Sequence, residues 1–177
     1  MSFDAQPTLT GADYALRPLV AADYGGLHAA ASDPEIWAQH PSPDRWKPEV
    51  YRPYFDSLLA SRATLAMRDV AQDRIIGCSR YYTAPDMPGT ISIGFTFLAR
   101  AYWGGAANRA VKGLMLAHAF ADFDAVWFHI GPDNIRSQKA TMKLGARHVY
   151  DATLDMGGGT VPWRCYRLNR DAWQPAM

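Results

Sequence analysis

Residues 91–120, ISIGFTFLARAYWGGAANRAVKGLMLAHAF, decide the fold predicted for this chain. Apolar side chains alternate at the start of this stretch and predict a strand over 90–98. Apolar residues at helical spacing then predict a helix over 108–120. The glycine and alanine residues between the two elements allow a sharp turn and a close approach of a ligand to the main chain. The stretch therefore predicts a strand, a tight turn, and a helix whose N-terminal N–H groups point into that turn.

The predicted turn has the properties of an anion-binding site. Helix N-termini carry unpaired N–H groups and a positive partial charge, which suit a phosphate or pyrophosphate. The same residues are also compatible with a plain strand-to-helix connection that binds nothing, and the turn alone leaves both alternatives open. It is not a P-loop, because no Lys-Ser or Lys-Thr follows the glycines. It also lacks the third glycine of a dinucleotide-binding turn.

A second strand-to-helix corner lies at Asn134, after a predicted strand over 125–130. Asn134 is a good N-cap for a helix over 135–144, which Gly145 would end. Ser137 lies one turn into this helix. Asn134 and Ser137 are either structural residues or two polar groups that face the ligand of the first turn.

The rest of the sequence predicts further elements around these two corners. Alternating or β-branched runs and apolar periodicity predict strands over 14–18, 63–70, 74–83, 147–151 and 163–168 and helices over 21–30 and 48–59. Their order predicts an α/β fold of the mixed α+β kind, with one mostly antiparallel sheet of about seven strands and helices on both faces. A single domain over 1–177 accounts for all of these elements.

The composition excludes several classes of protein. Hydrophobic residues make up 49% and charged residues 20% of the 177 residues, which is typical of a folded domain with its own core. The net charge of +1 argues against a general nucleic-acid-binding protein. Cys78 and Cys165 are expected to be reduced thiols that form no disulfide and no metal site. No signal peptide or membrane-spanning run is recognisable, so we expect a cytoplasmic protein that does not bind membranes.

The two corners together resemble the core of the GNAT acetyltransferase superfamily. The segments that carry the resemblance, in the same order and spacing, are 91–98, 102–108, 118–120, 132–137 and 143–146. The closest branch is similar to the ribosomal-protein N-terminal acetyltransferases of the RimJ/RimL type. One position departs from the family, since the Gln or Arg that usually begins the pyrophosphate loop is Ala101 here. Arg100, Arg109 or Lys112 could supply the positive charge instead.

The resemblance implies an N-acetyltransferase that uses acetyl-CoA as co-substrate and needs no metal. The acetyl-CoA arm would lie in a cleft where the fourth and fifth strands diverge. The acetyl group would pass directly to a primary amine, either a protein N-terminus or a small molecule. The residues implied in acetyl-CoA binding are Phe97, Leu98, Ala99, Trp103, Gly104, Gly105, Ala106, Ala107, Asn108, Arg109, Asn134 and Ser137.

The resemblance also implies roles for residues near the reacting groups. Ser137 would hydrogen-bond the departing thiolate, because the RimL-like branch has a serine at this place. Many other relatives use a tyrosine on this helix, and none lies between Asn134 and Gly145 here. His40 is the first candidate for the general base, with Glu35, Asp33 and a water relay as alternatives. His40 could instead hydrogen-bond its own loop. The candidates that line the acceptor site are Trp37, Arg80, Tyr82 and Thr96.

Two other functions are compatible with the sequence. The chain could be a GNAT-fold module that binds an acyl-CoA without turnover, an alternative that the departure at Ala101 supports. It could also be an α/β nucleotide-binding or nucleic-acid-associated protein, which the nearly neutral charge disfavours. An exposed last strand would allow a homodimer. The sequence leaves the identity of the acceptor amine open.

Overall fold

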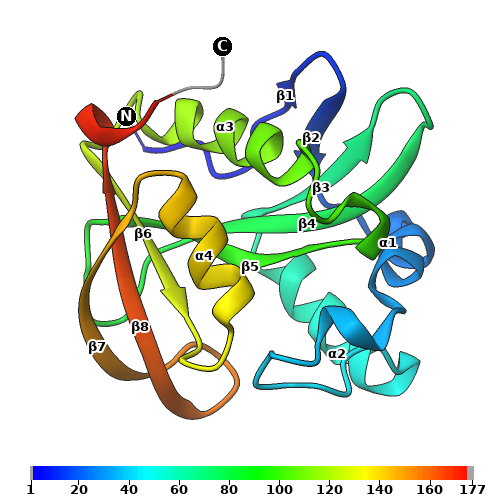
Figure 1. Ribbon diagram of the computed structural model, residues 1–177. Coiled ribbons are helices and arrows are strands. Elements are labelled where there is room, and N and C mark those ends of the chain that lie inside the picture. The colour runs from blue at the N-terminus through cyan, green and yellow to red at the C-terminus, as the bar shows by residue number, and fades with distance from the viewer. Residues whose placement is uncertain (1, 175–177) are drawn as a thin grey trace. The chain divides into compact units, whose positions relative to one another are not determined.

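The computed structural model of the chain describes residues 2–174. Its strands follow the order β1-β2-β3-β4-β5-β6-β8-β7 (Figure 1). The described chain divides into two compact units. Unit 1 holds residues 2–80 and 95–115, and unit 2 holds residues 81–94 and 116–174. The elements that pass from one unit into the other are β4 (Arg74–Tyr82), β5 (Ile91–Leu98) and α3 (Ala107–Ala119).

Unit 1 begins with an antiparallel run of strands. β1 (Leu9–Thr10), β2 (Tyr14–Pro18) and β3 (Thr64–Asp69) pair in sequence with the first part of β4. The sequence does not predict β1, because two residues are too few to show an alternation. The turn after β3 puts Asp73 in the left-handed region, with a φ of 49°, a conformation that aspartate tolerates better than most residues.

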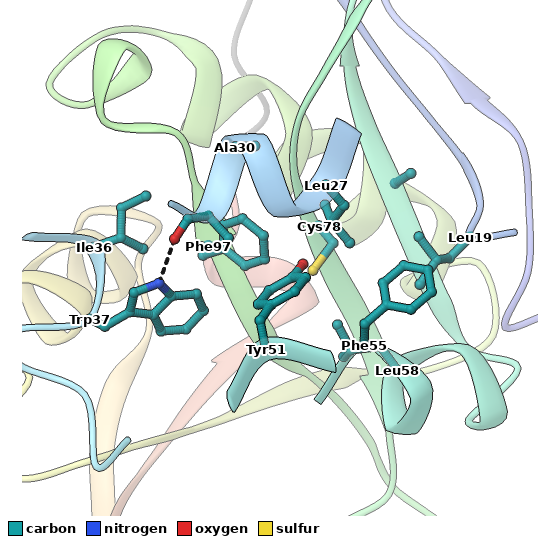
Figure 2. Close-up of a cluster of buried hydrophobic side chains, with 12 residues drawn as sticks. Leu19, Leu27, Ala30, Ile36, Trp37, Tyr51, Phe55, Leu58, Cys78 and Phe97 are labelled. Carbon is teal, nitrogen blue, oxygen red and sulfur yellow. Dashed lines mark hydrogen bonds between the residues drawn. The ribbon is translucent and has the colours of Figure 1, made fainter. Parts of the chain in front are cut away.

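The core of unit 1 lies between these strands and two helices, α1 (Tyr24–Ala31) and α2 (Pro48–Ala60). Short 3-10 turns, η1 (Ala21–Asp23) and η2 (Pro34–Ile36), precede and follow α1. Figure 2 shows Tyr51 of α2 pointing toward Cys78 of β4, with Phe97 of β5 nearby. Each such large side chain contributes about 1.5–3 kcal/mol when it is fully buried. The aromatic residues of α2 therefore hold this helix against the strands.

Unit 2 is built around β6 (Ala125–Ile130), which pairs antiparallel with β8 (Thr160–Asn169). β8 pairs on its other side with β7 (Arg147–Asp155), also antiparallel. Within this unit β5 runs parallel to β6, and their pairing covers Ile91 and Ser92 without reaching Ile93 or Gly94. Helix α4 (Ile135–Lys143) connects β6 to β7, and the 3-10 turn η4 (Arg170–Ala172) follows β8.

The last two strands are longer than the predicted ranges 147–151 and 163–168. The carboxylate of Asp155 accepts hydrogen bonds from the N–H groups of Gly157 and Gly159, which closes the hairpin and lets pairing extend to Asp155 and Thr160. The predicted exposed last strand is wrong, because β8 pairs on both sides and β7 is the terminal strand in the order. A homodimer formed by pairing through β8, as the sequence suggested, is therefore not possible while β8 keeps both neighbours.

The predicted fold class is confirmed. Among residues 2–174 the chain forms eight strands, most of them antiparallel, and four α-helices, against the expected seven strands. Helix α3 begins at Ala107, one residue before the predicted start, so Asn108 lies inside its first turn and does not cap it. Asn134 caps α4 as predicted, and Gly145 follows that helix with a φ of 101°. The prediction of one domain over 1–177 remains a prediction.

Candidate functional site

The turn between β5 and α3, in unit 1, has the geometry of an anion-binding site. Gly104 has a φ of 72°, which favours glycine, and a Cβ added there would meet no atom within 4 Å. The backbone N–H groups of residues 104–109 donate no hydrogen bond to any described residue. A helix N-terminus leaves four such groups unpaired, so the turn adds donors to the usual set. The first turn of α3 holds no acidic residue that would compensate the positive end of the helix dipole.

Two aromatic residues, Tyr102 and Trp103, fix the start of this turn, where the 3-10 segment η3 (Arg100–Tyr102) ends. The Tyr102 hydroxyl donates to a carboxylate oxygen of Asp69 at 2.7 Å and accepts from the Arg74 guanidinium at 3.1 Å. The indole Nε1 of Trp103 donates to the carbonyl of Leu98 at 3.0 Å. The backbone of the turn is therefore held by side chains that precede Gly104. The following residues, Gly104, Gly105 and Ala106, are all exposed, so the main chain of this part of the turn is accessible.

Part of the main chain expected to bind the acetyl-CoA arm is already used within unit 1. The Leu98 carbonyl accepts from Trp103, and the Ala99 N–H donates to the Ile76 carbonyl at 2.7 Å. The ring of Phe97 is buried in the core. The role predicted for the main chain of residues 97–99 stays a prediction, and a second lone pair on the Leu98 carbonyl remains for it.

The backbone of β5 is strained shortly before these residues. Phe95 has a φ of 50°, in the left-handed region that costs a non-glycine residue about 1–3 kcal/mol. Its carbonyl accepts a weak hydrogen bond from the Cys78 thiol at 3.6 Å. The guanidinium of Arg80, a residue predicted to line the acceptor site, lies 4.6 Å from the centre of the Phe95 ring. This irregularity distorts β5 just before the segment that the sequence associates with acetyl-CoA.

Lys112, on the second turn of α3, is buried and does not reach the anion-binding turn. Its Nζ donates to Ser79 Oγ at 3.0 Å and to Thr96 Oγ1 at 2.7 Å, and these two hydroxyls bond each other at 2.7 Å. Burial lowers the pKa of Lys112 to about 7. The suggestion that Lys112 neutralises a phosphate is therefore wrong. Thr96, predicted for the acceptor site, belongs to this internal network.

In unit 2, Asn134 and Ser137 form the second corner. Asn134 Oδ1 accepts from the backbone N–H of Ser137 at 3.2 Å, which makes Asn134 the N-cap of α4. The Ser137 side chain is half-buried, and its hydroxyl makes no hydrogen bond with any residue in 2–174. A free hydroxyl at the start of a helix can donate to an incoming ligand atom.

Gln138 is a structural residue of this corner that the sequence analysis missed. Its Nε2 donates to the carbonyls of Gly131 and Pro132, and its Oε1 accepts from the Tyr166 hydroxyl at 3.1 Å. The residue is almost fully buried. These bonds hold the strand-to-helix corner in place, so the orientation of Ser137 is supported by its neighbour. A buried amide has no sequence signal of its own, because its partners lie far along the chain.

Tyr82, predicted to contact the acceptor, also lies in unit 2. Its hydroxyl forms a 2.8 Å hydrogen bond with Nδ1 of His129. Burial lowers the pKa of His129, and its Nε2 is buried without a hydrogen-bond partner among the described residues. A Cβ on Gly94 would lie 2.8 Å from the Tyr82 ring, so the glycine makes room for that ring.

The predicted base, His40, is held in its own loop in unit 1. Its Nδ1 accepts from the Ser42 N–H at 3.0 Å, and its Nε2 lies 3.3 Å from the Arg45 guanidinium. Burial, together with the charge of Arg45, lowers the pKa of His40 to about 3. Such a histidine is neutral at physiological pH and a weak base. These contacts favour the loop-holding role over the catalytic one, and His40 as base stays a prediction.

The neighbouring candidates have structural partners as well. Trp37 is 2% exposed and donates from its indole to the Ala31 carbonyl at 2.8 Å (Figure 2). The carboxylate of Asp33 caps η2 by accepting from the Glu35 N–H and lies 3.4 Å from the Arg100 guanidinium. Arg100 is therefore paired with an acid, which reduces the charge that it could offer in place of the missing Gln or Arg. Arg109, in the first turn of α3, is exposed and carries no such pair among residues 2–174.

The cysteines, the metal-ligating side chains and the helix lengths of residues 2–174 bear on three expected absences. Cys78 and Cys165 are both buried and free, in agreement with the prediction of reduced thiols. Residues 2–174 contain no cluster of three metal-ligating side chains. No helix in that range is both long enough and apolar enough to cross a bilayer.

Comparisons with known proteins agree with this geometry. The sequence model of a family described as an acetyltransferase (GNAT) domain matches residues 14–147. A GCN5-related N-acetyltransferase from Brucella melitensis is 17% identical, with a TM-score of 0.80 over 95% of this chain and 80% of that one. Mycobacterium smegmatis RimJ in complex with CoA-disulfide is 14% identical, with a TM-score of 0.66 over 89% and 82%. A spermidine N-acetyltransferase from Vibrio cholerae, in complex with CoA and spermine, is 13% identical, with a TM-score of 0.63 over 92% and 98%. Among curated proteins no sequence matches.

Proposed function

Because this chain belongs to the GNAT acetyltransferase family, we propose that it transfers the acetyl group of acetyl-CoA to a primary amine. The observation that supports this most directly is the row of unpaired N–H groups over residues 104–109 at the start of α3. Their number and the absence of an acidic residue in that helical turn fit the pyrophosphate of coenzyme A. The residues of this chain therefore fit the co-substrate that the family uses.

We assign the binding of the pyrophosphate to backbone donors of unit 1. The N–H groups of Gly104, Gly105 and Ala106, followed by those of the first turn of α3, supply hydrogen bonds that do not depend on any one side chain. This explains why Ala101 can replace the usual Gln or Arg without loss of the cradle. Arg109 is the exposed cation of the same helical turn and adds charge for the phosphates.

In unit 2 we assign two polar groups to acetyl-CoA, in accordance with the family pattern. The amide of Asn134 contacts the pantetheine arm, and the Ser137 hydroxyl donates a hydrogen bond to the sulfur. Acetyl-CoA supplies the thioester; the nitrogen of a neutral amine bonds to its carbonyl carbon, the carbon–sulfur bond breaks, and the sulfur leaves as a thiolate. The amine proton passes to solvent or to a base. A hydroxyl that points at the sulfur stabilises the charge that develops there.

Replacing Ser137 by alanine is expected to lower kcat about 10- to 100-fold, since a donor to a developing charge is lost. The Kd of acetyl-CoA should change less than about two-fold, because the hydroxyl bonds the ground-state thioester weakly. Steady-state kinetics and calorimetry measure the two quantities. Ser137→Thr is the matched control, because it keeps a hydroxyl at the same helical position, and it should retain most of the rate. An unchanged kcat in Ser137→Ala would remove Ser137 from the mechanism.

The main alternative is a GNAT-fold module that binds an acyl-CoA without turnover. Calorimetric titration with acetyl-CoA, free CoA, ATP and NAD, followed by an assay of acetyl transfer to a panel of amines, separates the alternatives. Micromolar binding of acetyl-CoA with transfer to an amine is expected. Binding without any transfer would favour the module, and preference for ATP or NAD would contradict the proposed co-substrate.

The finer assignments rest on resemblance and are part of the same proposal. The RimJ/RimL branch would make a protein N-terminus the acceptor, and a small-molecule amine is the other class that the chemistry allows. A cytoplasmic enzyme without nucleic-acid or membrane partners is consistent with the net charge of +1. The homodimer is kept as a proposal without an assigned surface, and sedimentation velocity at two protein concentrations tests it.

A further inference from the structure

Two arginines of unit 1 lie over aromatic rings, and one of them, Arg80, is predicted to line the acceptor site. The guanidinium carbon of Arg45 is 3.8 Å from the centre of the Tyr54 ring and 5.2 Å from that of Trp37. Arg80 extends from β4 over the Phe95 ring at 4.6 Å. The charges of both arginines act on the Tyr54 hydroxyl and favour its ionised form. Arg45, from the loop before α2, lies over Tyr54, and the charge of Arg80, from β4, also acts on the Tyr54 hydroxyl.

Arg45 has no anionic partner within unit 1. No carboxylate of the described residues lies within 4.0 Å of it, and its polar contacts are the Ser42 hydroxyl at 3.3 Å and the ring of His40. The adjacent acid in the sequence, Asp44, pairs with Lys47 at 2.9 Å. Burial lowers the pKa of the Arg45 guanidinium, because a half-buried cation without a counter-ion is poorly solvated. Arginines in such surroundings are usually paired.

The ionisable groups that face Arg45 are neutral at physiological pH. Burial raises the pKa values of Tyr54 and Tyr51, and raises the pKa of the Cys78 thiol to about 12. The neighbouring His40 is neutral because burial lowers its pKa to about 3. The surroundings of Arg45 thus hold no titratable group that becomes negative near pH 7. Partial burial among aromatic rings also limits the screening of the Arg45 charge by salt.

We propose that Arg45 and Arg80 bind an anionic group of the acceptor, so that the amine acetylated by this chain also carries a carboxylate. A guanidinium presents two parallel N–H groups that match the two oxygens of a carboxylate. A polycation would be repelled by the same pair. The proposal rests on the proposed acetyltransferase function and names the substrate class of that function.

The test uses acceptors that differ only in the anionic group. The dipeptide amides Ala-Glu and Ala-Gln form one pair, and γ-aminobutyrate and its amide form a second; phosphoethanolamine with ethanolamine reports on phosphate, and spermidine on polycations. The wild-type chain should acetylate the carboxylate member of at least one of the first two pairs with a kcat/KM about 10-fold or more above its amide. Arg45→Gln and Arg80→Gln should each bring the ratio of kcat/KM for the carboxylate acceptor to that for its amide closer to one. The change should come mainly from a higher KM for the carboxylate acceptor.

Matched variants separate charge recognition from folding. Arg52→Gln is the control, because Arg52 also lies over an aromatic ring, that of Tyr24 at 4.8 Å, but is paired with Asp56 at 3.1 Å. It should leave the preference unchanged. Arg45→Lys and Arg80→Lys keep the charge without the planar fork and should retain part of the preference even if the glutamine variants fold poorly. Calorimetry with acetyl-CoA should give the wild-type Kd for all of these variants.

Each result decides the proposal. Equal use of carboxylate and amide acceptors, preference for spermidine or phosphoethanolamine, or transfer to none of the carboxylate acceptors by a protein that binds acetyl-CoA would overturn it. Loss of the preference in the control variant would overturn it as well. Failure of the wild-type protein to bind acetyl-CoA contradicts the proposed function itself, and calorimetry detects that failure separately.

Discussion

Replacing Gly104 by aspartate is expected to raise the Kd of acetyl-CoA about 100-fold or more, because a carboxylate a few ångström from a pyrophosphate costs several kcal/mol of Coulomb energy. The site is open enough to receive the side chain, since no atom lies within 4 Å of a Cβ built on Gly104. The loss should therefore come from charge and backbone conformation and not from a steric clash within the fold. Calorimetric titration of acetyl-CoA measures the effect.

Gly104→Asn is the control that isolates the charge. Asparagine has nearly the shape of aspartate and tolerates the left-handed φ of 72° better than most residues. Its Kd should rise less than about 10-fold. Equal affinities of the aspartate and asparagine variants would show that no anion binds at this turn. Circular dichroism spectra like those of the wild type confirm that both variants fold.

Replacing Lys112 by methionine is expected to stabilise the fold at and below neutral pH. It should also remove the part of the pH dependence of the free energy of unfolding that Lys112 causes. Burial lowers the pKa of Lys112 from 10.5 to about 7 in the folded chain. Between these values the unfolded chain binds the proton and the folded chain does not, so the free energy of unfolding of the wild type rises with pH across that window. Below about pH 7 both states are charged and the full penalty remains, about 5 kcal/mol as an upper limit.

Urea unfolding at about pH 6.5, 8 and 9.5 measures this difference, with the free energy of Lys112→Met minus that of the wild type as the quantity of interest. The difference should be largest at the lowest pH and shrink as pH rises. The hydroxyls of Ser79 and Thr96 keep their 2.7 Å hydrogen bond in the variant, so no polar group of this network is left unpaired. Lys139→Met, on the exposed side of α4, reports the effect of removing a surface charge. Parallel pH curves for wild type and Lys112→Met would contradict the buried-amine interpretation.

The local parts of the candidate site follow from short-range chemistry, and the sequence predicts them well. Gly104 is where a turn needs a positive φ, Asn134 is where a helix needs a cap, and Gly145 is where that helix needs a left-handed residue. Each of these roles depends on a few adjacent residues. The sequence therefore predicts both strand-to-helix corners and the order of the main elements. The family match over residues 14–147 agrees with that order.

The roles of side chains far from their partners are less accessible to sequence reasoning. Lys112 is read as a cation for phosphate, but its Nζ bonds hydroxyls that precede it by 33 and 16 residues. Trp37 is read as a pocket residue, but its indole packs in the core of unit 1. The sequence pattern gives no indication of a role for Arg45, because only the packing of its loop against α2 brings it to Tyr54.

The sequence by itself determined the α/β fold class, the glycine turn at Gly104 and the capped helix that carries Ser137. These features are set by backbone preferences and by hydrogen bonds between residues that are close along the chain. The tertiary structure alone decided that β8 is an interior strand, that Lys112 is buried, and that Arg45 lies over Tyr54 without a carboxylate partner among residues 2–174. Burial and charge pairing depend on which distant segments pack together, and this packing sets the pKa values and the electrostatic character of the candidate acceptor site.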